Sequence, residues 1–532
     1  LWKKVAPKLS AGRVQSVAVR LLVERERERR AFRSATYWDL EALLAASGDT
    51  SFRARLVQVD GKGIASGKSF DSTTGALSDT SVVLLDERRA RALADAAMAA
   101  RSFRVVKLET RPEQERPPVP FMTSTLQQEA NRKLRFSSKR TMQIAQQLYE
   151  GVDLEGQRTG LITYMRTDSL TLSERALSQC RALIEQNYGR DYLPPEPVRY
   201  RNKSKNAQEA HEAIRPTDLP RRPEELRGYL DPDQYRLYEL IWKRTVACQM
   251  VPARVLRTQV QVEVTATEGL PAPSTLRFSA SGKQIAFPGF LRAYVEGSDD
   301  PEAELQGQET LLPQLAEGQT LAAQAVDAKD HTTKPPARLT EASLVKRLEE
   351  LGIGRPSTYA SIIGTIIDRG YVFKQGNELV PTFTAFAVTE LLERHFTRLV
   401  DVRFTAKMED ELDEIAGGER DSVGYLKDFY AGNPEQPGIA QQVEERTPEI
   451  PFPAIELGAD PESGEPIIVK VGRYGTYVQR GAGGQGNTAS IPDDTVPADL
   501  SLDKVLELLR KKSQGPKVVG KDPSTGRDVV LR

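Results

Sequence analysis

The sequence has few cysteines and no long hydrophobic run. Its 532 residues include 2 cysteines, Cys180 and Cys248, which lie too far apart in the sequence to form a CxxC pair. This excludes a zinc ribbon or a disulfide framework and is typical of a reducing compartment. No stretch approaches the roughly 18 consecutive apolar residues of a membrane helix, so we expect no membrane span. The length exceeds what one hydrophobic core organises, and roughly three or four domains are expected.

Neither sign of charge is in excess overall, but charge is segregated along the chain. Lys plus Arg and Asp plus Glu each number 74, giving a formal net charge of +0. Residues 1–30 nevertheless hold nine basic residues against three glutamates, whereas residues 401–420 hold seven acids and three bases. Local clustering of cations, not net charge, governs binding to phosphates. The segregation fits a charged groove, although solvated helix faces explain any single run equally well.

Hydrophobic periodicity divides the chain into alternating helical and strand-like blocks. Proline-rich connectors at 111–120 and 329–340 and a proline- and glycine-rich linker at 433–453 separate several of these blocks. In chain order, we expect an amphipathic helix in "SAGRVQSVAVRLLVERERERR" capped by Ser10, strands over 37–108 interrupted by a helix at "ERRARALADAAMAA", two helices resembling a helix-turn-helix in "TSTLQQEANRKL" and "SSKRTMQIAQQLYEG", mostly helices over 170–246, strands over 254–325, and helices over 341–430.

The tail contains an internal repeat. "GADPESGEPIIVK" at 458–470 aligns with "GKDPSTGRDVVLR" at 520–532, an offset of 62 residues. The first copy continues into "VGRYGTYV", whereas the second stops at the last residue. Because the chain also begins at Leu1 without a methionine, we expect both ends to be cut. The positions shared by the two copies are Gly458 and Gly520, Asp460 and Asp522, Pro461 and Pro523, and Gly464 and Gly526.

The stretch "GLITYMRTDS", residues 160–169, places a tyrosine two residues before an arginine. If it is extended, Ile162, Tyr164 and Arg166 share one face, because side chains alternate along a strand. A phenol with a pKa of about 10 is a poor nucleophile at neutral pH. A neighbouring guanidinium favours the phenolate and can grip a phosphate with two hydrogen bonds. Taken alone, this stretch is still better explained by structural packing.

Two further stretches place polar side chains near chain turns. "NAQEAHEAIRPTD" puts His211 and Arg215 one helical turn apart, just before Pro216. "EELGIGRPSTYASIIGTIIDRGYV" has the pattern of a winged-helix-type turn and helix, whose glycines and hydroxyls suit a phosphate backbone. By contrast, "GKGIASGKS" is not a nucleotide-binding P-loop, because Lys62 stands where that motif requires glycine. We interpret it as a glycine-rich turn between strands.

Five separated motifs, in this order, closely resemble those of bacterial type IA DNA topoisomerases, the topoisomerase I family. They are "SAGRVQS", "PFMTSTLQQEA", "LITYMRTDS", "EAHEAIRPTD" and "GIGRPSTYASII". The resemblance covers nearly the whole chain. It implies that Tyr164 attacks DNA and becomes linked to a 5′-phosphate, with Arg166 holding the phosphate and His211 as an auxiliary catalytic residue. The DNA contacts that it implies are Ser10, Ala11, Gly12, Arg13, Val14 and Gln15, with Arg355, Ser357, Thr358 and Arg369 from the later helical block.

The same resemblance implies an α+β, multidomain, ring-like body plus a C-terminal repeat domain. In it, the domain that carries Tyr164 swings away to open a gate. The expected units are a helical DNA-binding domain (1–36 and 338–440), a strand-rich arch (37–118 and 247–337), a helix-rich domain with the tyrosine (119–246), a linker (441–455) and C-terminal repeats (456–532), the second truncated.

The implied activity is ATP-independent relaxation of negatively supercoiled DNA by transient single-strand cleavage, strand passage and resealing. Exchanging a phosphodiester for a phosphotyrosine diester is nearly isoenergetic, so resealing needs no ATP. Single-stranded or negatively supercoiled DNA is the expected partner, and the protein is expected to be monomeric and cytoplasmic, at the bacterial nucleoid. In the tail, Arg473, Tyr474 and Tyr477 could equally serve DNA binding or strand packing.

The chain departs from the family pattern at the metal site. Family members bind Mg²⁺ through acidic residues of a Toprim domain that precedes the "SAGRVQ" motif, and only nine residues precede Ser10 here. Asp231 and Asp233 match a DxD pattern but resemble a helix cap. The acidic stretch 408–414 is typical of a solvated helix face rather than a metal site. We therefore expect Mg²⁺ only in the full-length protein, no zinc, and a chain that binds single-stranded DNA but cleaves and reseals it poorly.

Three alternatives stay open. A topoisomerase III-like decatenase belongs to the same class, although the tail repeats favour topoisomerase I. The chain could instead act only as a single-stranded-DNA-binding module whose tyrosine is unused. A tyrosine recombinase or type IB enzyme places its nucleophile near the end of the catalytic region, whereas Tyr164 precedes most of its expected partners.

Overall fold

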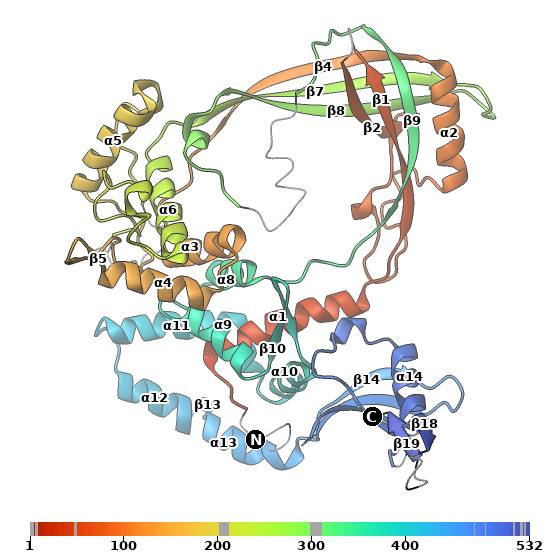
Figure 1. Cartoon of the computed structure of the whole chain (residues 1–532). Helices are drawn as coiled ribbons and strands as arrows, with labels where there is room; N and C mark the ends of the chain where they lie inside the picture. Colours follow the sequence, from red (N-terminus) through yellow and green to blue (C-terminus); the bar gives the residue numbers. More distant parts are fainter. Residues whose placement is uncertain are drawn as a thin grey trace.

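The chain is arranged as a ring with a small domain attached to it (Figure 1). A long sheet forms the top of the ring in this view, and two helix-rich bodies form its side and base. The C-terminal strands lie beside the base. The computed structural model describes residues 5, 9–46, 50–201, 212–297, 311–472, 474–484, 486–513, 517–521, 525 and 528–531.

The top of the ring, here called the arch, is a seven-stranded antiparallel sheet with the order β1-β9-β4-β7-β8-β2-β3. Because β1 also pairs with β2, the sheet closes on itself. Leu40, Ala42 and Leu44 alternate into its core, and helix α2 (Glu87–Ala100) covers it. The strands are β1 (Thr36–Ala45), β2 (Ser51–Val59), β3 (Lys62–Gly63), β4 (Ser102–Glu115), β7 (Ala253–Ala266), β8 (Ser274–Phe287) and β9 (Thr320–Thr332).

Three of these strands, β4, β7 and β8, run from the arch to the helix-rich body at the side of the ring (Figure 1). Their far ends carry charge pairs instead of a core: Lys283 Nζ lies 2.7 Å from Glu115, and Arg257 pairs with Glu113 and Glu115. The first half of the expected connector, residues 111–115, is therefore strand. Pro112 is tolerated there because β4 pairs with β9 only at its start, so the other edge is open.

The side of the ring, here called the tyrosine body, consists of residues 119–201, 212–252 and 288–297. Its core gathers Phe121, Leu126, Ile144, Ile162 and Ile241 with other buried side chains. Cys180 and Cys248 lie buried within this body as free thiols. Its elements are α3 (Thr123–Glu129) continuing into η3 (Ala130–Leu134), α4 (Ser138–Glu150), β5 (Val152–Leu154), β6 (Gln157–Thr159), α5 (Glu174–Tyr188), η4 (Arg190–Tyr192), η5 (Pro223–Leu226), α6 (Pro232–Ala247) and η6 (Gly289–Arg292).

The base of the ring, here called the helical body, combines residues 9–31 with 338–452. Helix α1 packs against α9, α10 and η7, so segments more than three hundred residues apart share one core. The hairpin β10–β11 after α9 agrees with the winged-helix pattern. Its elements are α1 (Arg13–Ala31), α8 (Glu341–Glu350), α9 (Tyr359–Asp368), β10 (Val372–Gln375), β11 (Glu378–Pro381), α10 (Phe383–His395), η7 (Thr397–Val400), α11 (Val402–Ala416), α12 (Ser422–Ala431), β12 (Gly432–Asn433), β13 (Gln436–Pro437), α13 (Ile439–Arg446) and η8 (Thr447–Glu449).

The linker and the helix start differ from the sequence-based expectation. The proposed linker contains α13, and Ile450 is buried in the core of the helical body, because apolar residues among the prolines find partners there. Ser10 does not cap α1: the N-cap is Gly12, which makes no side-chain capping bond. Asp231 does cap α6, since its carboxylate accepts from the backbone N–H groups of Asp233 and Gln234 at 2.9 Å each.

The tail repeat is visible in the strands. The hairpins β14–β15 and β18–β19 both contain a bulge, between Glu456 and Gly458 in the first and between Val518 and Gly520 in the second, 62 residues later (518 − 456 = 62). The first copy shares its hydrophobic core with the helical body. The tail elements are β14 (Ala454–Ala459), β15 (Pro466–Gly472), β16 (Gly475–Arg480), β17 (Thr488–Ser490), η9 (Pro497–Asp499), α14 (Leu502–Ser513), β18 (Lys517–Lys521) and β19 (Asp528–Leu531).

Candidate active site and nucleic-acid interface

The segment that carries Tyr164 is held from both sides by other parts of the tyrosine body. On one side, the backbone N–H of Thr163 donates to Arg215 O at 2.9 Å, and Thr217 N–H donates to Leu161 O at 3.0 Å. The Thr163 hydroxyl also donates to Ala213 O at 2.7 Å. The motif containing "AIRPT" therefore forms a brace along the first half of the tyrosine motif.

On the other side, one threonine of the "FMTST" motif holds the second half. The Thr123 hydroxyl donates to Met165 O at 2.6 Å and accepts from Thr167 N–H at 2.9 Å. The Thr123 N–H donates to Thr167 O at 2.9 Å. Since the backbone partners are split between two segments, the stretch is irregular and does not form the extended strand considered from the sequence.

This path separates the side chains of the motif. Ile162 and Met165 are buried, each 1% exposed, whereas Tyr164 is 42% exposed and Arg166 is exposed as well. The Tyr164 ring meets Tyr149 edge to face, with centroids 5.3 Å apart and planes at 65°. Within the described residues, no acid forms an ion pair with Arg166. The phenol thus stands at the surface of the core, followed two residues later by a cation open to an incoming anion.

The neighbouring histidine motif is only partly described. His211 lies outside the described residues. Residues 212–215 are not helical, so the predicted helical turn between His211 and Arg215 is wrong at its described end. The Arg215 side chain has a structural role, because its guanidinium links neighbouring segments. It donates to Pro216 O at 2.8 Å, to Ser173 Oγ at 3.2 Å and to Glu212 at 2.5 Å.

The "SAGRVQ" motif meets the end of the "GIGRPST" block. Ser10 N–H donates to the Tyr371 hydroxyl at 3.0 Å, and that hydroxyl donates to Ser10 O at 2.7 Å. Arg369 contacts the Ser10 hydroxyl, and Gln15 Nε2 donates to Ser10 O at 3.2 Å. The structure therefore brings together Ser10, Gln15 and Arg369, all predicted DNA contacts. They lie at the N-terminus of α1, where first-turn N–H groups lack partners within the helix and favour an anion.

Arg355 and Thr358 are engaged within the protein. The Thr358 hydroxyl accepts from Arg355 N–H at 2.9 Å and donates to Arg355 O at 3.0 Å. The Arg355 guanidinium binds acids of α11, so a phosphate contact by Arg355 would require displacing one of them. Ser357 is exposed. In the tail, Tyr474 is exposed and Tyr477 half-buried, while Arg473 lies outside the described residues.

The tyrosine body and the helical body meet at a polar contact, here called the seam. From the tyrosine body it contains Ser124, Gln128, Ser138 and Lys139; from the helical body it contains Glu341, Glu349 and Asp368. Ser138 N–H donates to Glu341 at 2.6 Å, Gln128 donates to Glu349 at 3.4 Å, and Lys139 lies 4.0 Å from Asp368. Burial raises the pKa of Glu349, although hydrogen bonds from Ser124 and Gln128 oppose the shift.

Sequence reasoning missed three carboxylates. At the seam, Glu341 belongs to no motif, and Glu349 opens the stretch "EELGIGRPST" but was given no role. Glu409, in the acidic stretch taken as a solvated helix face, is 1% exposed, which corrects that interpretation. It is buried because Arg13 and Arg355 converge on it. The available signal was charge complementarity, since an acid-rich segment at 401–420 accompanies a base-rich segment at 1–30.

The described part of the chain offers no group of three or more His, Cys, Asp or Glu side chains able to hold a metal ion. Asp231 is used as a helix cap, and Asp233 pairs with Arg140 at 2.7 Å. The described residues therefore do not fit a Mg²⁺ site. None of the helices in the described ranges is both long and apolar enough to cross a membrane.

Comparisons with known proteins agree with this geometry. A family model described as DNA topoisomerase matches residues 1–427, and one described as topoisomerase C-terminal repeat matches residues 460–517. DNA topoisomerase 1 of Streptomyces coelicolor is 53% identical over 100% of this chain and 56% of its own length. DNA topoisomerase 1 of Synechococcus elongatus is 50% identical over 100% of this chain and 57% of its own length. The chain thus spans a little over half the length of these relatives.

A solved structure is also similar. Full-length topoisomerase I from Thermotoga maritima aligns with a TM-score of 0.70 and 31% sequence identity, covering 93% of this chain and 73% of that chain. The α+β multidomain fold expected from the motifs is confirmed by this match. Family model, relatives and structure lead to one conclusion: the chain belongs to the bacterial DNA topoisomerase I family, the type IA topoisomerases.

Proposed function

We propose that the protein is an ATP-independent DNA topoisomerase that relaxes negatively supercoiled DNA through a covalent bond to Tyr164. The Tyr164 oxygen attacks a backbone phosphorus, the bond from phosphorus to the 3′-oxygen breaks, and the phenol gives up a proton to solvent while the leaving 3′-oxygen takes one up. A 5′-phosphotyrosine and a free 3′-hydroxyl result. Attack of that hydroxyl on the same phosphorus reverses the step and reseals the strand, with no net change in the number of phosphodiesters.

The observation that carries this proposal is the exposed phenol of Tyr164, followed two residues later by the exposed Arg166, on a segment braced on both sides. Charge builds up on the nonbridging oxygens as the nucleophile attacks, and a cation placed beforehand lowers that barrier. The braces hold the nucleophile on a rigid frame. Arg166 has donors to spare for a phosphate, because no described acid occupies them.

The same proposal assigns roles to the bodies of the ring. The tyrosine body moves as a unit away from the helical body, which holds single-stranded DNA at the N-terminus of α1 through Ser10, Arg13, Gln15 and Arg369. A second strand passes through the opening before resealing. The domain boundaries given in the sequence analysis remain predictions. His211 keeps its proposed auxiliary role, and Ala11, Gly12, Val14, Ser357 and Thr358 keep theirs as DNA contacts.

The family resemblance implies Mg²⁺ as the cofactor. The described residues of this chain provide no cluster of ligands for it, so none of the steps above runs through a metal ion. We also propose that the enzyme needs neither zinc nor ATP, works as a monomer, and acts on DNA in the cytoplasm, at the nucleoid.

The test uses the protein as its gene encodes it, incubated with Mg²⁺ and a single-stranded oligonucleotide labelled at its 3′ end. Denaturation with detergent should trap a labelled protein band, because the 5′-phosphate stays on the enzyme. Tyr164→Phe should bind the oligonucleotide as before and yield no band. The matched control is Tyr149→Phe, which alters the adjacent ring and should keep the band.

Two results would overturn the proposal. A labelled band that survives Tyr164→Phe would place the nucleophile elsewhere. Binding without any covalent band in the gene-encoded protein would leave a single-stranded-DNA-binding protein whose tyrosine is unused.

A further inference from the structure

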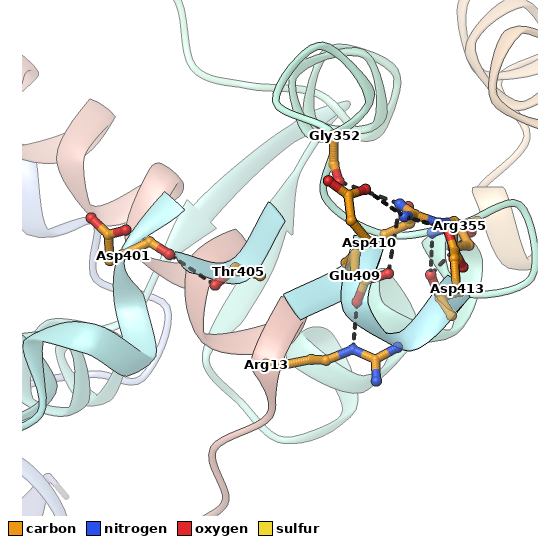
Figure 2. Close-up of polar contacts among 10 residues, drawn as sticks. Arg13, Gly352, Arg355, Asp401, Thr405, Glu409, Asp410 and Asp413 are labelled. Carbon is orange, nitrogen blue, oxygen red and sulfur yellow. Dashed lines mark hydrogen bonds and ion pairs between the residues drawn. The ribbon is translucent and has the colours of Figure 1, made fainter. Parts of the chain in front are cut away.

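One buried carboxylate of α11, Glu409, lies between the arginines of two separate motifs. Its Oε1 accepts from Nε of Arg13, in the "SAGRVQ" motif, and its Oε2 lies 3.8 Å from Nη1 of Arg355, in the "GIGRPST" motif (Figure 2). Glu409 is 1% exposed. Because a carboxylate is costly to bury without partners, the two guanidiniums supply the partners that this buried position requires.

The two arginines use their donors differently. All five N–H groups of Arg355 have acceptors within the protein. Nε donates to Asp413 at 3.0 Å, Nη2 donates to Asp413 at 2.7 Å and to Asp410 at 3.3 Å, and Nη1 donates to Gly354 O at 2.9 Å and Gly352 O at 3.3 Å. Arg355 is thereby fixed between α11 and its own loop.

Arg13 is anchored at one point only. Its Nε meets Glu409, and its side chain is 42% exposed. Figure 2 shows the two terminal nitrogens of Arg13 pointing away from Glu409, Asp410 and Asp413. Across the described residues, neither terminal nitrogen has an acceptor. The pair of terminal N–H groups that can grip a phosphate with two hydrogen bonds therefore faces outward.

We propose that Glu409 is a positioning residue for DNA binding, and this inference rests on the proposed function. Glu409 holds Arg13 by Nε, so that the terminal nitrogens of Arg13 meet one phosphate of the bound single strand. Arg355 contributes indirectly, because it fixes Glu409 from the other side. An arginine loses much side-chain freedom when it binds a phosphate, and an anchor made beforehand reduces that entropic cost.

A competing account makes Glu409 a neutralising charge. On that account, the carboxylate only cancels the positive charge of Arg13, and its removal should strengthen DNA binding. If Glu409 instead positions Arg13, its removal should weaken DNA binding. Glu409→Gln separates the two, because glutamine has one carbonyl oxygen and must present its NH₂ group to one of the two arginines.

The experiment is a fluorescence anisotropy titration of a labelled single-stranded oligothymidine with the purified chain at several salt concentrations. Glu409→Gln should weaken binding about 3- to 10-fold, the size of one partly lost charged contact. Arg13→Ala should weaken binding at least as much and reduce the salt slope by about 0.7, the value for one phosphate contact on a single strand. In the Arg13→Ala background, Glu409→Gln should have no further effect.

The matched control is Glu411→Gln on the same helix. Glu411 pairs with Arg420 at 3.0 Å and touches neither Arg13 nor Arg355. Glu411→Gln changes the net charge of the protein by the same amount as Glu409→Gln. We expect unchanged or slightly tighter binding. Circular dichroism melting of each variant checks that it is folded.

Arg13→Lys tests the idea without changing the Glu409 side chain itself. Lysine keeps the positive charge, but its single ammonium group cannot contact Glu409 and also offer a phosphate two separate terminal nitrogens. The Arg13→Lys variant should therefore bind DNA like Arg13→Ala. Wild-type affinity in Arg13→Lys, stronger binding in Glu409→Gln, or an equal loss from Glu409→Gln with and without Arg13 would each overturn the proposal. Failure of the wild-type chain to bind the oligonucleotide would instead count against the proposed function.

Discussion

The carboxylate of Glu341 joins the two bodies whose separation the proposed mechanism requires. Its Oε2 accepts from the backbone N–H of Ser138, the first residue of α4, at 2.6 Å. Its Oε1 accepts from Lys374 Nζ at 2.8 Å within the helical body. A first-turn N–H has no partner inside its own helix, so Ser138 depends on Glu341 for its hydrogen bond. We predict that Glu341→Gln makes the seam easier to open.

The size of the effect follows from these contacts. Glutamine supplies one acceptor oxygen, so either the bond to Ser138 becomes a neutral one or Ser138 N–H is left without an acceptor. The difference between a charged and a neutral hydrogen bond, or the cost of one buried unpaired donor, is about 1–3 kcal/mol. Lys374 is 35% exposed and is rehydrated on losing its partner, so it adds little. Opening should therefore become about 5- to 150-fold more frequent.

Hydrogen exchange of the Ser138 amide measures this opening directly. Mass spectrometry with residue-level fragmentation should show faster exchange of that amide in Glu341→Gln, with unchanged rates in the arch strands β7 and β8. The matched control is Glu350→Gln on the same helix, whose side chain pairs with Arg347 at 3.6 Å and has no other ion pair among the described residues. It should leave Ser138 unchanged. An unchanged Ser138 rate in Glu341→Gln would refute the role of the carboxylate, and faster exchange everywhere would indicate global destabilisation instead.

Two further predictions concern the seam and the active site. Burial raises the pKa of Glu349 above its ordinary 4.5, so the closed seam binds the proton of Glu349 more tightly than the open, hydrated seam does. Closure of the seam therefore weakens as pH rises through the window between the ordinary and the raised pKa. Ser138 exchange, corrected for its intrinsic rate, should slow as pH falls through the window, and Glu349→Gln should abolish this dependence; a dependence that persists would contradict the assignment. Arg166→Ala should lower the rate of covalent adduct formation about 10²- to 10³-fold, as for loss of one charge-stabilising donor, with nearly unchanged DNA affinity. Arg166→Lys should recover only part of this loss, and a wild-type rate in that variant would argue against a two-point grip on the phosphate.

Local periodicity was enough to predict most helices and strands, but not how the sheet closes. Strand β1 pairs along its whole length with β9, from Thr36 opposite Thr332 to Ala45 opposite Ala322. Such pairing depends on contacts between residues nearly three hundred positions apart, which no window of sequence contains. The helix α13 was missed for a different reason, since prolines and glycines around it resemble a linker, whereas its Ile439 and Val443 pack against the core of the helical body.

The candidate site was predictable in its residues and not in its shape. The motifs identify Tyr164 and Arg166 by resemblance, and the alternation rule suggested an extended strand. That rule assumes one partner strand on each side, whereas here Thr123 and the segment around Arg215 divide the hydrogen bonds of the motif between them. Likewise, an acidic run is usually solvated, but Glu409 is buried because its partners arrive from Arg13 and Arg355, far away in sequence.

The distribution of apolar side chains explains how a ring held by many contacts can still open at one place. The buried apolar side chains of the tyrosine body and those of the helical body form separate clusters, and the seam between them is built from polar groups. Parting two apolar faces costs free energy for every exposed Å², whereas polar groups exchange protein partners for water at little net cost. The seam even contains a buried atom that has no hydrogen bond among the described residues, the hydroxyl of Ser138, and this hydroxyl gains a partner when water enters. Opening at the seam is therefore cheaper than breaking either core, which supports the proposed movement of the tyrosine body as a unit that carries Tyr164.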